Sequence, residues 1–402
     1  MGKRAQRIKL ELRRWISHGS ISFLVMGLFG AIAAEFAPRP AIAQSSPAPL
    51  QLAQVDHATF EPEDTRWQPG IRWQKRYVVL GSDRFPVFSL EFAANNRGVA
   101  LRPIWSDPHR MEGTSPLVEM GQRWQAFAAI NAGFFNRNNR LPLGALRRDG
   151  RWFSGPILNR GAIAWNDQGQ FRIGRLTLQE TITTATGQRL FISHLNSGYV
   201  QAGMARYTPD WGVSYRPLTD NEIIIYVEGD QVQEHYAGGT AGEVEFPLPD
   251  NGYLLVIRAG SVSREQLPVG MRVTVSTTTT PGDFASYPHI IGAGPLLLEG
   301  GRVVLNAEAE KFSAAFAQQA ASRTLIGTTA NGNVILAVVH NRVDGRGPSL
   351  PELAGLAQRL GMTHALNLDG GSSSSFYLGG QLVDRPPAGA ARVHNAIGVY
   401  VP

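Results

Sequence analysis

The sequence predicts an α+β or α/β fold with a mixed sheet, and three stretches carry this prediction. Residues 334–339 and 365–368 are short, unbroken apolar runs, which are typical of buried strands. Between them, residues 349–360 have the pattern of an amphipathic helix. A third stretch, at about 171–285, alternates β-rich runs with Gly, Pro and Asp turns. We therefore expect a C-terminal strand-helix-strand unit and a β-rich middle segment.

The expected helix carries its own start and stop signals. Ser349 stands at the N-cap and Glu352 at the third helical position, which is the pattern of a capping box, and Gly361 ends the helix. Strand-helix-strand units connect parallel strands in a right-handed crossover, so both strand ends and the helix start should share one edge of the sheet. We expect His340, Glu352 and Asp369 to face one crevice at this edge.

A hairpin signal adds a cation to the same edge. Asn331-Gly332 predicts a type I′ turn, and the register that follows from it places Arg323 opposite His340. A bulge in the hairpin would break this pairing. An arginine, a histidine, a carboxylate and a helix N-terminus at one edge suit a sugar and an anion such as phosphate.

Two buried strands end in a polar residue followed by glycine. Residues 365–368 lead into Asp369-Gly370-Gly371 and a run of four serines. A carboxylate followed by glycines that let a ligand approach the backbone is a common way to build a site, and a tight turn with a soluble Ser loop is the alternative. Residues 126–130 lead in the same way into Asn131-Ala132-Gly133, where the amide would orient a sugar hydroxyl or satisfy its own turn.

Composition limits the classes of partner. The chain has 402 residues, of which 43% are hydrophobic and 17% charged, so one large domain or two closely packed ones can form a core. The net charge is +6, but no Lys/Arg run with interleaved aromatics follows the N-terminus, and we expect no nucleic-acid binding. A mildly basic surface suits an anionic polysaccharide or the cell envelope. The absence of cysteine excludes disulfides, a thiol nucleophile and a Cys-zinc site.

The N-terminus predicts export. Residues 1–20 are rich in Lys and Arg, residues 21–34 form an apolar run that is short for a membrane span, and Ala41-Ile42-Ala43 is a small-x-small cleavage signal. We expect a secretory signal peptide at 1–43, a Pro/Ser/Gln-rich linker at 44–70 and the main domain at 71–402. An uncleaved membrane anchor is the alternative, and both predict a periplasmic or extracellular domain.

Six short boxes occur in a fixed order along the main domain. They are residues 131–135, 292–295, 323–327, 350–354, 367–373 and 392–396. As an ordered set, they resemble the boxes of the phosphodiester glycosidase family over residues 71–402. Ala132 and Ser372 depart from the family pattern, which has Gly at both positions. The resemblance implies hydrolysis between the anomeric carbon of a sugar and a phosphodiester oxygen, on an envelope or exopolysaccharide glycan.

The resemblance also implies roles for individual residues. Asp369 is expected to be the main carboxylate, as base or nucleophile, and Glu352 the second candidate, although helix capping explains Glu352 equally well. Arg323 would hold phosphate with the help of His340. The expected substrate site is completed by Asn131, Gly133, Asn367, Gly370 and Gly371. We expect no cofactor and no metal, because the spacing of Asp344 and Asp369 is not that of a tight metal site.

Two other functions remain open at this stage. The same crevice could belong to a non-catalytic envelope module that binds glycan without cleaving it. A different hydrolase could use one of the four serines at 372–375 as a nucleophile, but the chain has no Gly-x-Ser-x-Gly elbow.

Overall fold

The computed structural model describes residues 61–66, 70–259, 262–342 and 344–401. The described chain consists mainly of antiparallel β-sheets, at 45% strand and 13% helix, so the predicted α+β or α/β class is wrong. Its α-helices are α2 (Leu117–Arg123), α3 (Ala314–Gln318) and α4 (Leu350–Arg359). Each strand pair among these residues is antiparallel, except that β12 and β13 are parallel.

The largest sheet has eight strands and contains the C-terminal segment that predicted the fold class. In spatial order its strands are β1 (Glu63–Arg66), β2 (Ile71–Leu80), β3 (Asp83–Ala93), β24 (Asn333–Val339), β23 (Arg323–Thr329), β25 (Met362–Asn367), β21 (Leu296–Glu299) and β22 (Arg302–Val303). β1 lies inside the range predicted as a linker, 44–70.

Two five-stranded sheets supply further parts of the main domain. One orders β27 (Gln381–Leu382), β26 (Phe376–Leu378), β5 (Ala128–Asn131), β28 (Asn395–Tyr400) and β4 (Ala100–Trp105). The other orders β7 (Arg151–Ser154), β6 (Leu146–Arg148), β20 (His289–Gly292), β8 (Gly161–Trp165) and β9 (Phe171–Arg175).

The predicted β-rich middle segment consists of strands in sheets of their own, apart from β9. A five-stranded sheet orders β12 (His194–Leu195), β13 (Gly203–Tyr207), β18 (Gly252–Arg258), β15 (Ile223–Glu228) and β16 (Gln231–Ala237). A three-stranded sheet orders β11 (Arg189–Ile192), β10 (Thr177–Thr184) and β19 (Val273–Thr280), and β14 (Ser214–Tyr215) pairs with β17 (Phe246–Pro247).

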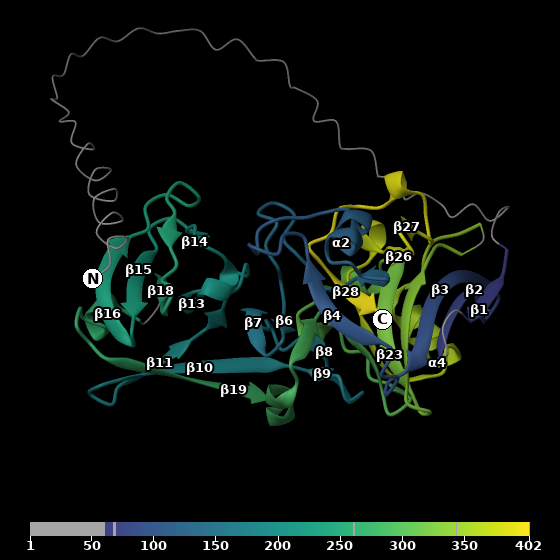
Figure 1. Ribbon diagram of the computed structural model, residues 1–402, viewed down its shortest axis with the longest axis horizontal. Helices are drawn as coiled ribbons and strands as arrows, with labels where there is room; N and C mark the ends of the chain where they lie inside the picture. The colour runs from purple at the N-terminus through teal and green to yellow at the C-terminus, as the bar shows by residue number, and fades with distance from the viewer. Residues whose placement is uncertain (1–60, 67–69, 260–261, 343, 402) are drawn as a thin grey trace, which may run out of the picture. The chain divides into compact units, whose positions relative to one another are not determined.

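The error in fold class has a local cause. β24, α4 and β25 form as predicted, but β23 lies between the two strands and is antiparallel to both. α4 packs on one face of this sheet, where Leu353 and Leu356 share a buried cluster with Ala337 (Figure 1). Leu336 belongs to the core on the opposite face. Since both faces are covered, β24 is apolar throughout, as a parallel strand of an α/β protein would be.

The predicted hairpin register is also wrong, by one residue. Arg323 pairs with Val339 rather than with His340. Gly332 has φ of +75°, whereas Asn331 keeps a negative φ, so the turn is not the type I′ that would need both residues left-handed. The Gly332 N–H donates to the Thr329 carbonyl at 3.1 Å, and residues 330–332 form a three-residue loop between β23 and β24.

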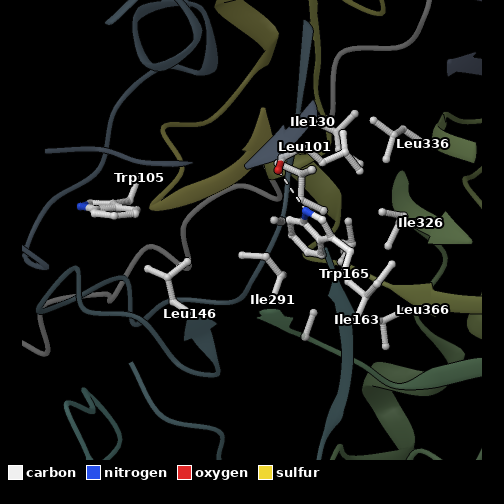
Figure 2. Close-up of a cluster of buried hydrophobic side chains, with 14 of the residues drawn as sticks. Leu101, Trp105, Ile130, Leu146, Ile163, Trp165, Ile291, Ile326, Leu336 and Leu366 are labelled. Atoms are coloured by element: carbon white, nitrogen blue, oxygen red, sulfur yellow. Dashed lines mark hydrogen bonds between the residues drawn. The ribbon is translucent and has the colours of Figure 1, made fainter. Parts of the chain in front are cut away.

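The main core lies between the sheets. Figure 2 shows part of it, in which Trp165 is surrounded by aliphatic side chains and its indole N–H donates to the Leu101 carbonyl at 3.0 Å. The other labelled members are Trp105, Ile130, Leu146, Ile163, Ile291, Ile326, Leu336 and Leu366. These residues come from the eight-stranded sheet and from the two five-stranded sheets that contain β5 and β8, so the core fixes the strand ends that carry the candidate site.

Candidate functional site

The backbone of Asp369 is held by a neighbouring sheet. Asp369 follows the end of β25, and its N–H donates to the Ala132 carbonyl at 2.7 Å. Its own carbonyl accepts a bond from Asn131 Nδ2, also at 2.7 Å. Asn131 ends β5, which belongs to a different sheet, and Ala132 follows it directly. Two bonds from this second sheet therefore fix the position of the Asp369 carboxyl group.

The two glycines that follow Asp369 are favoured for different reasons, a close backbone contact at Gly370 and a left-handed backbone at Gly371. A Cβ added at Gly370 would lie 3.0 Å from the Ser322 carbonyl oxygen. Gly371 has φ of +66°, in the left-handed region, and donates to that same carbonyl at 2.7 Å. The Gly370 N–H donates to Asp369 Oδ1 at 3.0 Å. The turn thus presents the Asp369 carboxyl group next to the start of β23.

Asp369 and Arg323 influence each other through their charges. Burial raises the pKa of Asp369 to about 6, although bonds from Ser373 and the Gly370 N–H and the charges of Arg137 and Arg323 lower it. Burial lowers the pKa of Arg323 to about 10, and Asp369 counteracts this shift. Asp369 is crowded by protein but keeps some exposed surface, so a ligand can reach it. At neutral pH the pair holds a carboxylate beside a guanidinium.

Arg323 is a buried and anchored cation at the predicted position. Its side chain is 1% exposed, Nε donates to the Pro348 carbonyl at 3.2 Å and Nη2 donates to the Gln319 carbonyl. A Cβ added at Gly370 would lie 3.6 Å from Nη1, so this end of the guanidinium faces the Asp369 turn. Because Nε and Nη2 are bound to these two carbonyls, the guanidinium is fixed and Nη1 is oriented for an anion at the turn.

His340 lies behind the turn in a closed network. Its Nε2 pairs with Asp384 Oδ2 at 2.8 Å, and its Nδ1 accepts from Arg385 Nη2 and faces Ser322 Oγ, each at 3.0 Å. Since the arginine can only donate, the imidazole proton is on Nε2. Burial lowers the pKa of His340, so the ring is neutral. His340 is 1% exposed and therefore braces the turn from behind.

The two predicted sugar-binding amides are buried. Asn131 Oδ1 accepts from Thr324 Oγ1 at 2.7 Å and from the Ser375 N–H at 3.1 Å. Asn367 Nδ2 donates to the Gly294 carbonyl at 2.7 Å. Both residues are 0% exposed. The structure places their side chains in the frame of the site, where they join strands to one another.

Gly133 belongs to the same frame. Its N–H donates to Asn395 Oδ1 at 2.6 Å, and an added Cβ would lie 2.9 Å from the Gly292 carbonyl oxygen. The 131–135, 292–295 and 392–396 boxes therefore pack against each other at backbone distance.

Glu352 caps α4. Its Oε2 accepts from the Ser349 N–H at 2.7 Å and from Ser349 Oγ at 2.8 Å, which completes the predicted capping box. Its Oε1 lies 3.7 Å from Arg342 Nη1. Both carboxylate oxygens thus have partners at the helix start, and the contacts of Asp369 do not include this group.

Several residues at the site escaped the sequence analysis. Arg137, in the loop that follows β5, acts on the Asp369 carboxyl group through its charge. Asp384 and Arg385 follow a short hairpin that carries no motif. The rings of Phe134, Phe312 and Phe316 form a cluster, with Phe312 and Phe316 stacked at 5.0 Å. Two guanidinium groups cover this cluster, Arg160 at 4.0 Å from the Phe312 ring and Arg323 at 5.4 Å from the Phe316 ring.

The described part of the chain contains neither a metal-ligating cluster nor a membrane-spanning helix. No group of three or more His, Asp or Glu side chains there is arranged to hold a metal ion. No helix among the same residues has the length and hydropathy needed to cross a membrane. The predicted signal peptide, 1–43, lies outside the described residues.

A family model described as phosphodiester glycosidase matches residues 221–400. This part of the chain belongs to the phosphodiester glycosidase family. The match includes Arg323, Asp369 and the turn glycines, whereas the 131–135 box lies before it. No curated protein matches the sequence.

Three solved structures are similar to this chain. A hypothetical protein from Synechocystis shares 52% identity with a TM-score of 0.83, over 85% of this chain and 64% of that one, so this chain spans less than two thirds of that relative. A putative exported protein from Burkholderia pseudomallei has 22% identity and a TM-score of 0.65, over 80% and 74% of the two chains. The catalytic domain of zebrafish N-acetylglucosamine-1-phosphodiester alpha-N-acetylglucosaminidase, auto-inhibited by its pro-peptide, has 14% identity and a TM-score of 0.44, over 87% of each chain.

Proposed function

We propose that this chain is a hydrolase that cleaves the bond between a sugar's anomeric carbon and a phosphodiester oxygen. The observation that carries the proposal is the turn at Asp369, where a partly exposed carboxyl group lies beside the anchored guanidinium of Arg323. A carboxylate and a cation at one point are what this reaction needs.

In the proposed reaction the phosphate ester leaves as an anion. The oxygen of water forms a bond to the anomeric carbon, either directly with Asp369 as base or after Asp369 has attacked as nucleophile. The bond from this carbon to the phosphodiester oxygen breaks, and its electron pair stays on the phosphate. Arg323 stabilises the departing negative charge, assisted by Arg137. The products are a free sugar and a phosphate monoester.

The phosphate is a good leaving group, so the proposal does not need a second carboxyl group as general acid. This agrees with the position of Glu352, whose oxygens are bound at the helix start. His340 takes part only by holding Ser322 and the turn behind Asp369.

We further propose that the substrate is a glycan outside the cytoplasm, in the envelope or in exopolysaccharide. The support is the basic N-terminal region, apolar run and Ala41-Ile42-Ala43 signal, together with the net charge of +6. Mass spectrometry of the secreted protein tests the export proposal, with a mature N-terminus at Gln44 as the expected result. A soluble cytosolic protein that still begins at Met1 would contradict it.

Hydrolysis of UDP-sugars by the purified chain tests the activity, beside Asp369→Asn and a matched change at an exposed carboxylate, Glu265→Gln. We expect free sugar from the wild type and from Glu265→Gln, and a loss of about 100-fold or more in Asp369→Asn. Equal rates in all three would move the reaction away from Asp369. Sugar binding without cleavage across several UDP-sugars would favour the glycan-binding module instead.

A further inference from the structure

A cavity of about 350 Å³ lies among residues that have no part in the Asp369 site. Four segments form its walls: the loop that follows β4, the C-terminal end of α2, the hairpin of β6 and β7, and a short 3₁₀ helix, Pro209–Trp211. Ligand cavities begin at about 300 Å³, so this volume is enough for one sugar residue. Its lining combines aromatic rings with charged groups at the rim.

Trp105 provides the aromatic base of the cavity. Its ring centroid lies 4.9 Å from that of Trp124 and 4.5 Å from that of Phe153, and all three residues line the cavity. The trio forms a continuous aromatic wall. Because the C–H faces of a pyranose are apolar, such a wall suits a sugar ring that turns one face toward it.

The indole N–H of Trp105 has no acceptor among the described residues, although Trp105 is 2% exposed. Trp165, in the same core, donates its N–H to the Leu101 carbonyl. Figure 2 shows the difference: the nitrogen of Trp165 points at Leu101, whereas that of Trp105 points away from the other side chains drawn. A buried N–H without an acceptor destabilises a protein, and an oxygen that enters the cavity would satisfy it.

The rim carries paired charges. Arg148 Nε lies 3.2 Å from Asp149 Oδ2, and Arg151 Nη2 pairs with Asp210 Oδ1. Asp149 and Arg151 are 62% and 64% exposed, so both pairs are weak and can give up their mutual contacts to a ligand. Each pair offers donors and acceptors side by side, as adjacent sugar hydroxyls require. The third arginine of the lining, Arg110, lies 3.2 Å from Asp107, so each arginine of the lining has a carboxylate partner and the rim favours a neutral ligand.

We propose that this cavity is a carbohydrate-binding site, which takes one neutral pyranose unit of a glycan. The ring stacks on the aromatic wall, one oxygen accepts from the Trp105 N–H, and two hydroxyls bind the Arg151–Asp210 and Arg148–Asp149 pairs. None of the described residues that line the cavity belongs to the Asp369 site. The proposal is therefore independent of the proposed hydrolysis.

The test titrates the full chain with neutral oligosaccharides of glucose, galactose, mannose and N-acetylglucosamine, and with a glucuronate oligosaccharide, by calorimetry. We expect one neutral sugar to bind, unchanged in Asp369→Asn. Arg151→Ala and Asp149→Ala, whose side chains are exposed, should weaken binding about tenfold. Arg264→Ala, at an arginine that is 59% exposed, is the matched control and should bind as the wild type does.

Trp105→Phe keeps an aromatic ring and removes the N–H, so it should weaken binding several-fold. The indole N–H signal that is missing from the NMR spectrum of this variant is the signal of Trp105. That signal should shift when sugar is added to the wild type. The proposal is overturned if no neutral oligosaccharide binds, if only the glucuronate binds, if Arg151→Ala binds with unchanged affinity, or if binding disappears in Asp369→Asn. Loss of hydrolysis alone leaves this titration unaffected, so the two proposals fail separately.

Discussion

Two carboxyl groups near the ends of β24 and β25 are in opposite situations. Asp384, which pairs with His340 after β24, has a fully buried side chain with partners on both oxygens. Asp369, after β25, keeps some exposed surface and has a raised pKa beside an anchored cation. The first group stabilises the fold because its charge is matched within the protein. The charge of the second group is only partly compensated by its neighbours, and chemistry at a site requires such a group.

The largest effect expected from this comparison is on stability. Asp384→Asn removes the charge opposite Arg385, whose side chain is 3% exposed, and leaves a buried cation without its partner. We expect the free energy of unfolding to fall by about 3–5 kcal/mol in urea denaturation. Asp369→Asn is the matched control and should be no less stable than the wild type at pH 7. Equal losses in both variants would remove the distinction between the two groups.

The next effect concerns activity. Arg323→Gln removes the cation that faces the Asp369 turn, and we expect kcat/KM for a sugar-1-phosphodiester to fall about 100-fold, as for a lost charged hydrogen bond to phosphate. Arg359→Gln, at an exposed position at the end of α4, should keep the wild-type value. Because Arg323 lowers the pKa of Asp369, the acidic limb of the variant's pH–rate profile should also move to a higher pH. A variant with the wild-type rate and pH profile would exclude a role for Arg323 in the reaction.

The pH profile provides the third prediction. Burial raises the pKa of Asp369 from 3.8 to about 6, so a reaction that needs its carboxylate should lose about tenfold in kcat/KM per pH unit below 6. The folded protein binds this proton more tightly than the unfolded chain, so the contribution of Asp369 to stability should decrease as pH rises from about 4 to 6. Urea denaturation at several pH values should show this decrease in the wild type and not in Asp369→Asn. A rate that rises toward low pH would assign Asp369 the role of an acid.

The smallest effect is expected at Arg137. This exposed residue lowers the pKa of Asp369 through its charge alone. Arg137→Ala should therefore move the acidic limb of the rate profile to slightly higher pH, by a few tenths of a unit at about 0.15 M salt and by more at low salt. Rate profiles at two salt concentrations measure the shift. A limb that moves equally at both would indicate a direct contact with the substrate.

Local features of the chain were predictable from the sequence, because local physical rules produce them. Ser349 and Glu352 form the predicted capping box, Gly370 makes a close backbone contact, and Gly371 has a left-handed backbone. Asp369 and Arg323 also lie together, as predicted, since β24 and β25 run in the same direction on the two sides of β23. Both residues therefore lie at one edge of the sheet, as predicted, although the predicted fold class is wrong.

Relations between distant strands were less predictable. A buried antiparallel strand and a buried parallel strand have the same apolar composition, so Val334 to Val339 could not reveal its neighbours. The single left-handed residue at Gly332 shifts the hairpin by one position and turns His340 toward Asp384. Asn131 carries no mark that distinguishes an amide facing a sugar from one that holds the backbone of a residue 238 positions away.

The bonds from Ala132 and Asn131 to the backbone of Asp369 have a consequence for how this protein can be divided. The family match begins at residue 221, but the strand that holds Asp369 in place ends at Asn131. A fragment cut at the family boundary would contain the carboxyl group, the arginine and the turn glycines without the contacts that position them. The smallest unit able to form this site therefore begins well before the segment by which the family is recognised.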